Sequence, residues 1–311
     1  INSDLKPFME KGATTLKDSI IKRMKQVEVP LAEQQFNEKP PKSKISKGLS
    51  TMKLNDIGMN IIHPTELARQ IALLDHKLYR SIKMEECLHM RWTKSNKEEL
   101  APNVIKSIKQ FCNVGNWVTS QIVQEYDLEK RSSLLYKFVQ AAYESYKFKN
   151  FNGAMSIISG LQNHCVKRLK LTWDQIPDKG WDMWEELSDV FKCDQNFASL
   201  RSVNAKSSLP AVPYLGMYLS DLTFIDNEGN FIKENPSLIN FVKMLYIGNI
   251  IRQIEKYQQG GYNFATVPIL QNYLLDLPIL SEKEFYSHST QCESKKGSHA
   301  SVLLEKRSSG K

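Results

Sequence analysis

The sequence predicts an all-α fold, a single large multi-helix domain from which a helical hairpin protrudes. Apolar residues recur at intervals of three and four along most of the chain from His63, which is the spacing of one face of a helix. No strand-like alternation is sustained, and proline and glycine fall mostly between the periodic runs. At 311 residues the chain is long enough to bury one large core.

The periodic runs predict the helices in order. In the first run Leu67, Ile71, Leu74 and Leu78 share one face, and Pro64 lies in the first turn, a position that proline favours. The later runs have the same spacing and comprise Val104, Ile105, Ile108, Phe111 and Cys112; Leu134, Leu135, Phe138, Val139, Ala142 and Tyr146; Phe151, Ala154, Met155, Ile158 and Leu161; Trp184, Leu187 and Phe191; Leu270, Tyr273 and Leu274; and Phe285.

The formal net charge of +8 lies at the two ends of the chain. Residues 1–53 carry 11 basic and 6 acidic side chains, residues 291–311 carry 5 and 2, and residues 54–290 carry 26 of each. We therefore expect a basic polar linker or partial N-terminal segment over 1–53, a neutral domain over 54–290 and a flexible basic tail over 291–311. Basic ends are compatible with weak contact with acidic membranes or nucleic acid, but we favour their interpretation as solubility tails. The neutral body argues for a protein partner rather than nucleic acid.

Residues 1–53 contain two recognisable features. Leu16, Ile20, Ile21 and Met24 would form one face of a short amphipathic helix over 14–27, and the Lys- and Pro-rich stretch 39–44 is typical of a linker. Ile1 stands where an initiating Met is expected, so we interpret the chain as a fragment of a longer protein or a processed one.

The sequence shows none of the patterns of bond-making or bond-breaking catalysis. Five cysteines without C-x-x-C spacing and six histidines without H-x-x-x-H spacing indicate neither a disulfide framework nor a metal site. Neither a G-x-S-x-G nucleophile motif nor a G-x-x-x-x-G-K-[ST] phosphate loop occurs. No apolar run approaches the roughly 18 residues of a membrane span. We expect a cytoplasmic protein without cofactor or metal, recruited to membranes, if at all, by regions outside this sequence.

Residues 209–257 form the predicted hairpin. Pro210 and Pro213 restrict the backbone and give it a rigid entry. Apolar segments over 214–225 and 238–257 flank a polar turn, Asp226-Asn227-Glu228-Gly229-Asn230. We favour helix–turn–helix; a short β-hairpin that pairs 223–225 with 230–232 is the alternative. The second helix is expected to pack on the core through Phe241 and Leu245 and to expose its other side.

Four stretches, in order, resemble the catalytic domain of Ras-family guanine-nucleotide exchange factors. They are His63-Pro64-Thr65-Glu66-Leu67-Ala68-Arg69-Gln70, Asn150-Phe151-Asn152-Gly153, Arg168-Leu169-Lys170-Leu171-Thr172-Trp173, and Pro210-Ala211-Val212-Pro213-Tyr214 followed by Leu219-Ser220-Asp221-Leu222. The family pattern usually has Cys or Thr in place of Ala211. The resemblance covers roughly residues 54–287, and four ordered motifs are a specific signal where one alone is weak.

The resemblance implies a guanine-nucleotide exchange factor that promotes GDP release from a Ras-family small GTPase. The hairpin, about residues 213–257, is expected to act as a wedge against switch I of that GTPase. The implied partner is a Ras, Rap, Ral or Rheb-like protein. Two alternatives stay open, namely a GTPase-binding scaffold of the same fold without exchange activity, and an all-α scaffold whose hairpin docks an unrelated partner helix.

The resemblance also implies the site residues. Thr223, Glu228 and Asn230 are expected to act at the nucleotide site, with Thr223 toward the magnesium ion and Glu228 near the groups that bind phosphate. Further contacts with the GTPase are expected from Arg80, Asn152, Tyr214, Asp221 and Lys243.

Four side chains have a structural interpretation, and for Asn152 it stands beside the expected contact with the GTPase. Asn152, near a helix start, is suited to capping the helix as well as to contact with switch II. Arg168 is expected to tie a loop to the core. Trp117 and Trp173 are expected to be buried, because large aromatic side chains dominate core packing.

Overall fold

The computed structural model describes residues 36, 38–45, 53, 56–233 and 235–294. The chain divides into two compact units, residues 1–37 and residues 38–311. Phe36 is the described residue of the first unit, and the helix predicted over 14–27 lies outside the described residues. All described helices belong to the second unit, which is therefore the subject of the description below.

The second unit is helical, with one short two-stranded sheet among its described residues. The all-α prediction is confirmed. In chain order the elements are α2 (Pro64–Arg80), η3 (Met84–Cys87), η4 (Arg91–Thr93), α3 (Lys97–Leu100), α4 (Pro102–Val123), α5 (Leu128–Lys147), α6 (Phe151–Leu161), α7 (His164–Lys167), α8 (Lys170–Asp174), α9 (Asp178–Phe191), α10 (Asp194–Lys206), α11 (Leu215–Asp226), β1 (Phe231–Ile232), β2 (Asn235–Ile239), α12 (Phe241–Lys256), α13 (Pro268–Leu275) and α14 (Glu282–Cys292).

The helices begin where the local sequence supplies a start signal. Proline occupies the first position of α2 and α4, where its missing N–H costs nothing. The Asp127 carboxylate accepts the backbone N–H of Lys130 at the start of α5 (2.9 Å), and Ser281 with Glu284 forms a capping box on α14. With these starts, the helices contain every periodic run that the sequence predicted.

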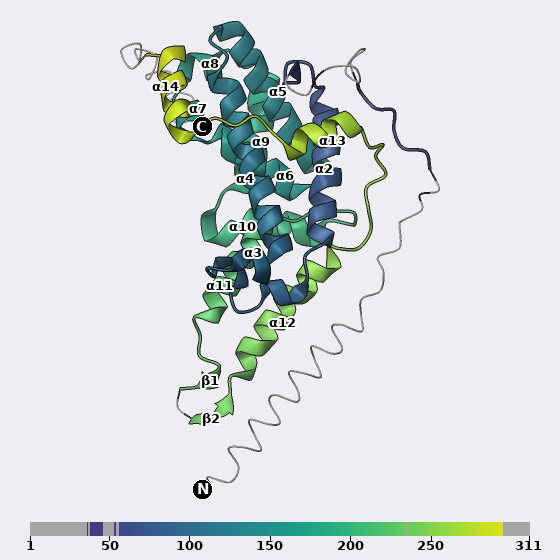
Figure 1. Ribbon diagram of the computed structural model, residues 1–311, viewed down its shortest axis with the longest axis vertical. Helices are drawn as coiled ribbons and strands as arrows, with labels where there is room; N and C mark the ends of the chain where they lie inside the picture. The colour runs from purple at the N-terminus through teal and green to yellow at the C-terminus, as the bar shows by residue number, and fades with distance from the viewer. Residues whose placement is uncertain (1–35, 37, 46–52, 54–55, 234, 295–311) are drawn as a thin grey trace. The chain divides into compact units, whose positions relative to one another are not determined.

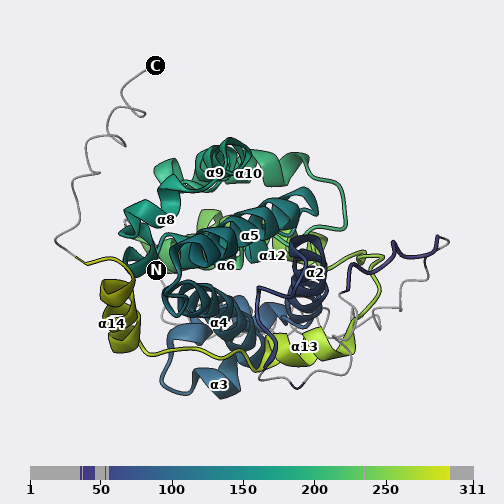
Figure 2. The same cartoon turned by 90° about the horizontal axis from the view of Figure 1, so that it is seen from above.

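Helix α6 is central to the core and packs against both α4 and α5 (Figure 2). The crossing of α4 and α6 is close because it is made at two glycines: a Cβ on Gly160 would lie 2.4 Å from the carbonyl oxygen of Gly115. Trp117 on α4 is fully buried and donates from Nε1 to the Tyr273 hydroxyl on α13 (3.0 Å). Trp173 is buried as well, so both expectations for tryptophan are confirmed.

The predicted linker over 39–44 lies against the helical unit. The backbone N–H of Lys44 donates to the Glu66 carboxylate (2.8 Å), and the Lys42 carbonyl accepts from the Arg69 guanidinium (3.0 Å). These contacts explain why the compact unit begins at Glu38 rather than after residue 53.

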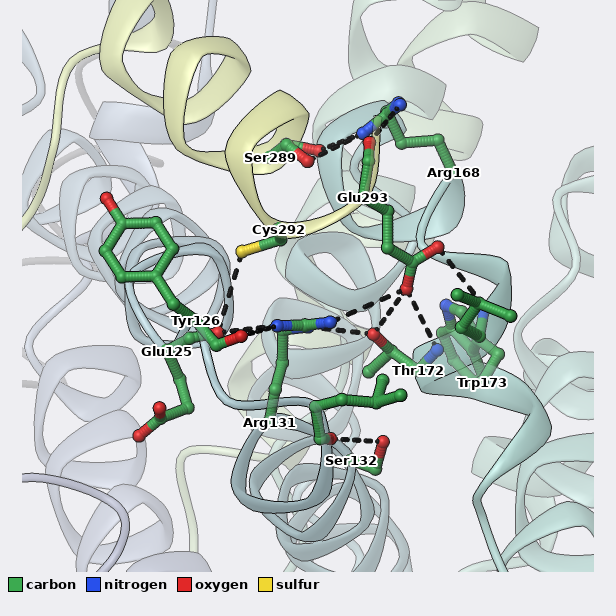
Figure 3. A network of polar contacts seen from close by, with 12 residues as sticks. Glu125, Tyr126, Arg131, Ser132, Arg168, Thr172, Trp173, Ser289, Cys292 and Glu293 are labelled. Atoms are coloured by element: carbon green, nitrogen blue, oxygen red, sulfur yellow. Dashed lines mark hydrogen bonds and ion pairs between the residues drawn. The ribbon is translucent and has the colours of Figure 1, made fainter. Parts of the chain in front are cut away.

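Helix α14 is held to the body by the polar network of Figure 3. Arg168 donates to the carbonyl oxygens of Ser289 (2.7 Å) and Glu293 (2.8 Å), which fulfils its expected role of tying a loop to the core. The Glu293 carboxylate accepts from the backbone N–H of Thr172 (3.0 Å) and lies 3.7 Å from the buried guanidinium of Arg131. The boundary expected after residue 290 therefore cuts the last turn of α14 and separates Glu293 from its partners.

Helices α11 and α12 pack against each other and extend from the body as a hairpin, with β1 and β2 at its tip (Figure 1). The helical arms are as predicted, but the tip differs. Residues 223–225 are helical, so the alternative pairing of 223–225 with 230–232 is wrong; β1 pairs instead with β2, with Phe231 opposite Ile239. Helix α12 begins only at Phe241, after Asn240 caps it by accepting the Lys243 N–H (3.1 Å), so residues 235–239 remain extended and pair with β1.

The expected packing of α12 on the core through Phe241 and Leu245 is wrong. These side chains are 66% and 48% exposed, and the buried residues of α12 are Lys243, Ile251 and Ile254. The first half of α12 lies on the projecting part of the hairpin, where little except α11 is available for packing, so its apolar side chains face solvent.

Candidate functional site

The base of the hairpin is joined to the start of α6 through the backbone. The carbonyl of Val212 accepts the N–H groups of Phe151 (2.8 Å) and Asn152 (3.2 Å), and the N–H of Val212 donates to the Lys149 carbonyl (2.9 Å). Two N–H groups that have no partner within the first turn of α6 are satisfied in this way. Two sequence motifs some 60 residues apart thereby meet at one place in the fold.

The helix cap at the start of α6 is Asn150, not Asn152. The Asn150 side chain accepts the N–H of Gly153 (3.0 Å) and donates from its amide nitrogen to the Asp75 carboxylate on α2 (2.9 Å). Burial raises the pKa of Asp75 to about 7, while hydrogen bonds from the side chains of Asn150 and Asn152 act in the opposite direction. Asn152 is buried and does not cap the helix, so the capping role suggested for it from the sequence is wrong.

A groove of about 630 Å³ runs between α4, the start of α6 and α11. It brings together three of the predicted site residues, Asn152, Tyr214 and Thr223. Its other lining residues are Trp92, Ser107, Ile108, Phe111, Cys112, Leu215, Gly216, Leu219, Ser220, Phe224 and Asn227.

The Tyr214 ring is held between two aromatic side chains. Its centroid lies 5.4 Å from that of Phe111 and 5.6 Å from that of Phe197. Gly216 leaves room for it, since a Cβ there would lie 2.4 Å from the ring. Thr223, nine residues after Tyr214, donates its hydroxyl to the Leu219 carbonyl (2.8 Å). The groove is lined mainly by apolar and aromatic side chains, with polar side chains at Ser107, Asn152, Ser220, Thr223 and Asn227.

Asp221 is turned away from this groove and toward α10. Its carboxylate forms a bidentate ion pair with Arg201 (2.8 and 2.9 Å) and accepts from the Asn196 amide (3.0 Å). On the same helix, Asn204 donates to the Tyr218 hydroxyl (3.1 Å), and its carbonyl accepts from Tyr257 (2.9 Å). Helix α10 thus fixes the base of both arms of the hairpin.

Arg80 lies at the end of α2, outside the lining of the groove. The neighbouring carbonyls of Tyr79 and Ile82 accept from the Gln258 amide (3.0 and 2.7 Å), just beyond the end of α12. The Nε atom of Arg80 is buried and has no hydrogen-bond partner among the described residues. The structure therefore places Arg80 at the foot of the second arm, apart from Asn152 and Tyr214.

The tip gathers the remaining predicted residues. Lys243 is 4% exposed, and its ammonium donates to the Glu228 carbonyl (2.6 Å), the Asn230 side-chain oxygen (2.9 Å) and the Asp226 carbonyl (3.3 Å). The Glu228 side chain points outward: it is exposed, and no described residue donates to its carboxylate or pairs with it. Of these residues, Glu228 is the one whose charge is available to another molecule.

An exposed apolar surface covers the hairpin. Ten of the eighteen exposed large apolar side chains of the described residues lie between Phe224 and Tyr246. We call this set the hairpin apolar surface; it consists of Phe224, Phe231, Ile232, Leu238, Ile239, Phe241, Val242, Met244, Leu245 and Tyr246. Exposed apolar side chains that gather on one projecting element in this way indicate an interaction site.

The sequence analysis missed two parts of this site. Trp92, Ile108 and Phe111 line the groove, although the period of α4 alone assigns the last two to the core. The partial exposure of α12 was expected, but Phe241 and Leu245 were assigned to the core, because an apolar period does not tell a face that packs on the body from one that projects into solvent. The polar tip beyond α11 is the signal that could have located them.

The family model of the RasGEF domain matches residues 66–245. This chain belongs to the RasGEF domain family. It is 41% identical over 224 residues to Ras guanine nucleotide exchange factor Y of Dictyostelium discoideum. The aligned region covers 72% of this chain and 15% of that relative. The chain is 38% identical over 231 residues to Ras-specific guanine nucleotide-releasing factor 2 of Mus musculus, covering 73% and 19%.

The RasGEF match ends within α12, so it includes both the groove and the tip of the hairpin. The chain spans less than a fifth of the length of these two relatives. Among the described residues, no helix is both long and apolar enough to cross a lipid bilayer.

Proposed function

We propose that this chain is a guanine-nucleotide exchange domain that accelerates GDP release from a Ras-family small GTPase. The observation that carries the proposal is the hairpin apolar surface, which ends in an outward carboxylate at Glu228 and adjoins the groove lined by Asn152 and Tyr214. Membership of the RasGEF family and the names of the relatives supply the partner class.

Such a protein needs no nucleophile, general base or cofactor. It binds the nucleotide-free GTPase more tightly than the loaded one, and linkage then requires that it weaken nucleotide binding by the same factor. Nucleotide release then results from displacement of GTPase segments and from charge, and no covalent bond is made or broken. This requirement suits a projecting hairpin better than an enclosed pocket.

We assign the two parts of the site different tasks. The groove takes up switch II, because it combines a mainly apolar lining with polar side chains such as the amide of Asn152. The hairpin displaces switch I, with Thr223 toward the magnesium site and Glu228 toward the groups that otherwise hold phosphate. A carboxylate there competes for the same positive charges as the departing phosphate.

The test is release of fluorescent GDP from purified GTPases of the Ras, Rap, Ral and Rheb types, in the presence of excess unlabelled nucleotide. The chain at a tenth of the GTPase concentration should accelerate release at least tenfold for one of them. Binding without release would instead indicate a scaffold of this fold. Absence of binding to every GTPase would contradict the assignment of the hairpin.

A further inference from the structure

We infer that Lys243 is a positioning residue that locks the tip of the hairpin and thereby aims Glu228, rather than a residue that contacts the GTPase. This inference rests on the proposed exchange function for its consequence, but the lock itself is a property of the free chain. It differs from the direct contact expected from the sequence, and three observations carry it.

The first observation is the use of the ammonium group. Lys243 has three N–H donors and three acceptors within 3.3 Å, namely the carbonyls of Asp226 and Glu228 and the side-chain oxygen of Asn230. The Asp226 carboxylate lies 3.8 Å away and supplies a counter-charge. An ammonium group that is buried and fully used in this way has no donor left for a partner protein.

The second observation is where the acceptors lie. Asp226 is the last residue of α11, and Glu228 follows in the turn. Carbonyls at the end of a helix lack partners within the helix, and a cation there also interacts favourably with the helix dipole. Lys243, in the first turn of α12, therefore closes the end of the opposite arm and joins the two helices at the tip.

The third observation is that Asn240 completes the lock from the same turn. Its amide nitrogen donates to the Gly229 carbonyl (3.1 Å), and its backbone N–H donates to the Asn230 carbonyl (2.8 Å). Residues 226–230 are thus held at Asp226, Glu228, Gly229 and Asn230, all from the start of α12. The one long side chain of the turn that none of these contacts uses is that of Glu228.

The consequence concerns rate rather than affinity. With the backbone of Glu228 fixed, its carboxylate is presented in one direction, and little conformational freedom has to be lost when it meets its target. Release of the lock should leave the hairpin apolar surface in place but allow the turn to move. The rate of nucleotide release at saturating GTPase should then fall, while the GTPase concentration for half-maximal rate stays the same.

The experiment compares the parent chain with Lys243→Met, which keeps the apolar stem and removes the ammonium. Exchange of the amide hydrogens of Glu228 and Asn240, both bonded within the tip, should become at least tenfold faster in the free variant. The maximal rate of GDP release should fall roughly tenfold, with an unchanged KM. The double variant Glu228→Ala with Lys243→Met should be no slower than Glu228→Ala alone, because the two residues act through one carboxylate.

Asn240→Asp is the second variant, in case Lys243→Met does not fold. It keeps the side-chain oxygen that caps α12 (3.1 Å from the Lys243 backbone nitrogen) and removes the donor to Gly229. It should shift amide exchange and maximal rate in the same direction by a smaller factor.

Three results would overturn the inference: an increase in KM with unchanged amide protection, which indicates direct contact; unchanged protection in both variants; or additive loss in the double variant. If the parent accelerates release from no GTPase, the exchange function fails instead, while amide exchange still decides whether the lock exists.

Discussion

The buried carboxylate of Asp75 accepts a hydrogen bond of 2.9 Å from the side chain of Asn150, the residue that caps α6 at the edge of the groove. This pair links α2, the first long helix, to the start of α6, where the hairpin base is also attached. Burial raises the pKa of Asp75 from 3.8 to about 7. No cationic side chain among the described residues offsets this effect, and only the hydrogen bonds from Asn150 and Asn152 lower the pKa.

The raised pKa predicts a pH dependence of stability. Between pH 4 and pH 7 the folded chain keeps a proton on Asp75 that the unfolded chain has lost, so this group's contribution to the free energy of unfolding decreases as pH rises and levels off above 7. A shift of this size corresponds to about 4 kcal/mol. Asp75→Asn cannot ionise and should gain up to about 4 kcal/mol relative to the parent between pH 4 and pH 8.

Urea unfolding of both proteins at unit pH intervals measures this difference. His76, whose pKa is lowered to about 4 by burial, titrates in both proteins and contributes loss of stability toward acid pH in each. It therefore cancels when the variant is compared with the parent. Parallel stability curves from pH 4 to pH 8 would show that Asp75 keeps an ordinary pKa.

The network around Glu293 predicts where the chain can be shortened. A chain that ends at residue 294 keeps the Glu293 carboxylate beside Arg131, which is 1% exposed, whereas a chain that ends at 290 leaves that guanidinium without its counter-charge. Removal of one partner of a buried pair costs about 3–5 kcal/mol. The chain ending at 290 should therefore unfold roughly 10 °C below the chain ending at 294 in thermal scans.

Glu293→Gln in the full chain is the control for this truncation. The amide oxygen can still accept from the Thr172 backbone N–H, while the charge and the acceptor for the Leu171 N–H (3.2 Å) are lost, so the decrease in the unfolding midpoint should be smaller than that of the truncation. Equal midpoints for the two shortened chains would mean that Arg131 is stabilised sufficiently by the carbonyls of Glu125 and Tyr126 and the hydroxyl of Thr172.

The exposure of Phe241 predicts that binding and stability can be separated. Phe241→Ser changes a side chain that is 66% exposed, so the free energy of unfolding should change by less than about 0.5 kcal/mol. If the hairpin apolar surface meets the GTPase, loss of a large aromatic contact there should weaken binding of the nucleotide-free GTPase roughly thirtyfold, because such residues dominate interfaces.

Leu275→Ser is the matched control, since Leu275 on α13 is 60% exposed but lies outside the hairpin. Affinity is measured by titration of nucleotide-free GTPase in calorimetry. Equal affinities for Phe241→Ser and Leu275→Ser would place the GTPase contact elsewhere on the domain.

The sequence predicted the body of this fold well because helix starts and apolar period are local signals. Pro64 and Pro102 begin their helices as expected, and most residues of the runs in α5 and α6 are buried, with Leu134, Tyr146 and Met155 half-buried. The tip was less predictable. Whether Phe241 is buried depends on what lies opposite it, and a period of 3.6 residues carries no information about the neighbour.

The predictability of the candidate site also differs from residue to residue. Asn152 and Tyr214, two of the expected contacts with the GTPase, line one groove together with Thr223, whereas Arg80 lies outside it. The internal roles of Asp221 and Lys243 were not predictable, because each depends on a contact across two elements: with Arg201 on α10, and with the end of α11. A charged residue in a motif is equally compatible with a partner outside the chain and one within it.

Glu228 carries the most direct prediction for exchange. Its carboxylate is exposed and unpaired among the described residues, so Glu228→Ala removes a charge without breaking an internal contact, and the unfolding free energy should change by less than about 0.5 kcal/mol. A charge-assisted hydrogen bond contributes on the order of 1.5–3 kcal/mol, which corresponds to a loss of roughly ten- to a hundredfold in the rate of GDP release. Asn227→Ala, one residue earlier and also exposed, is the comparison; its side chain lines the groove but carries no charge, so it should slow release less than Glu228→Ala does. A slow Asn227→Ala with an unaffected Glu228→Ala would assign the role to the neighbouring side chain; parent rates in both would leave displacement by the hairpin apolar surface as the source of exchange.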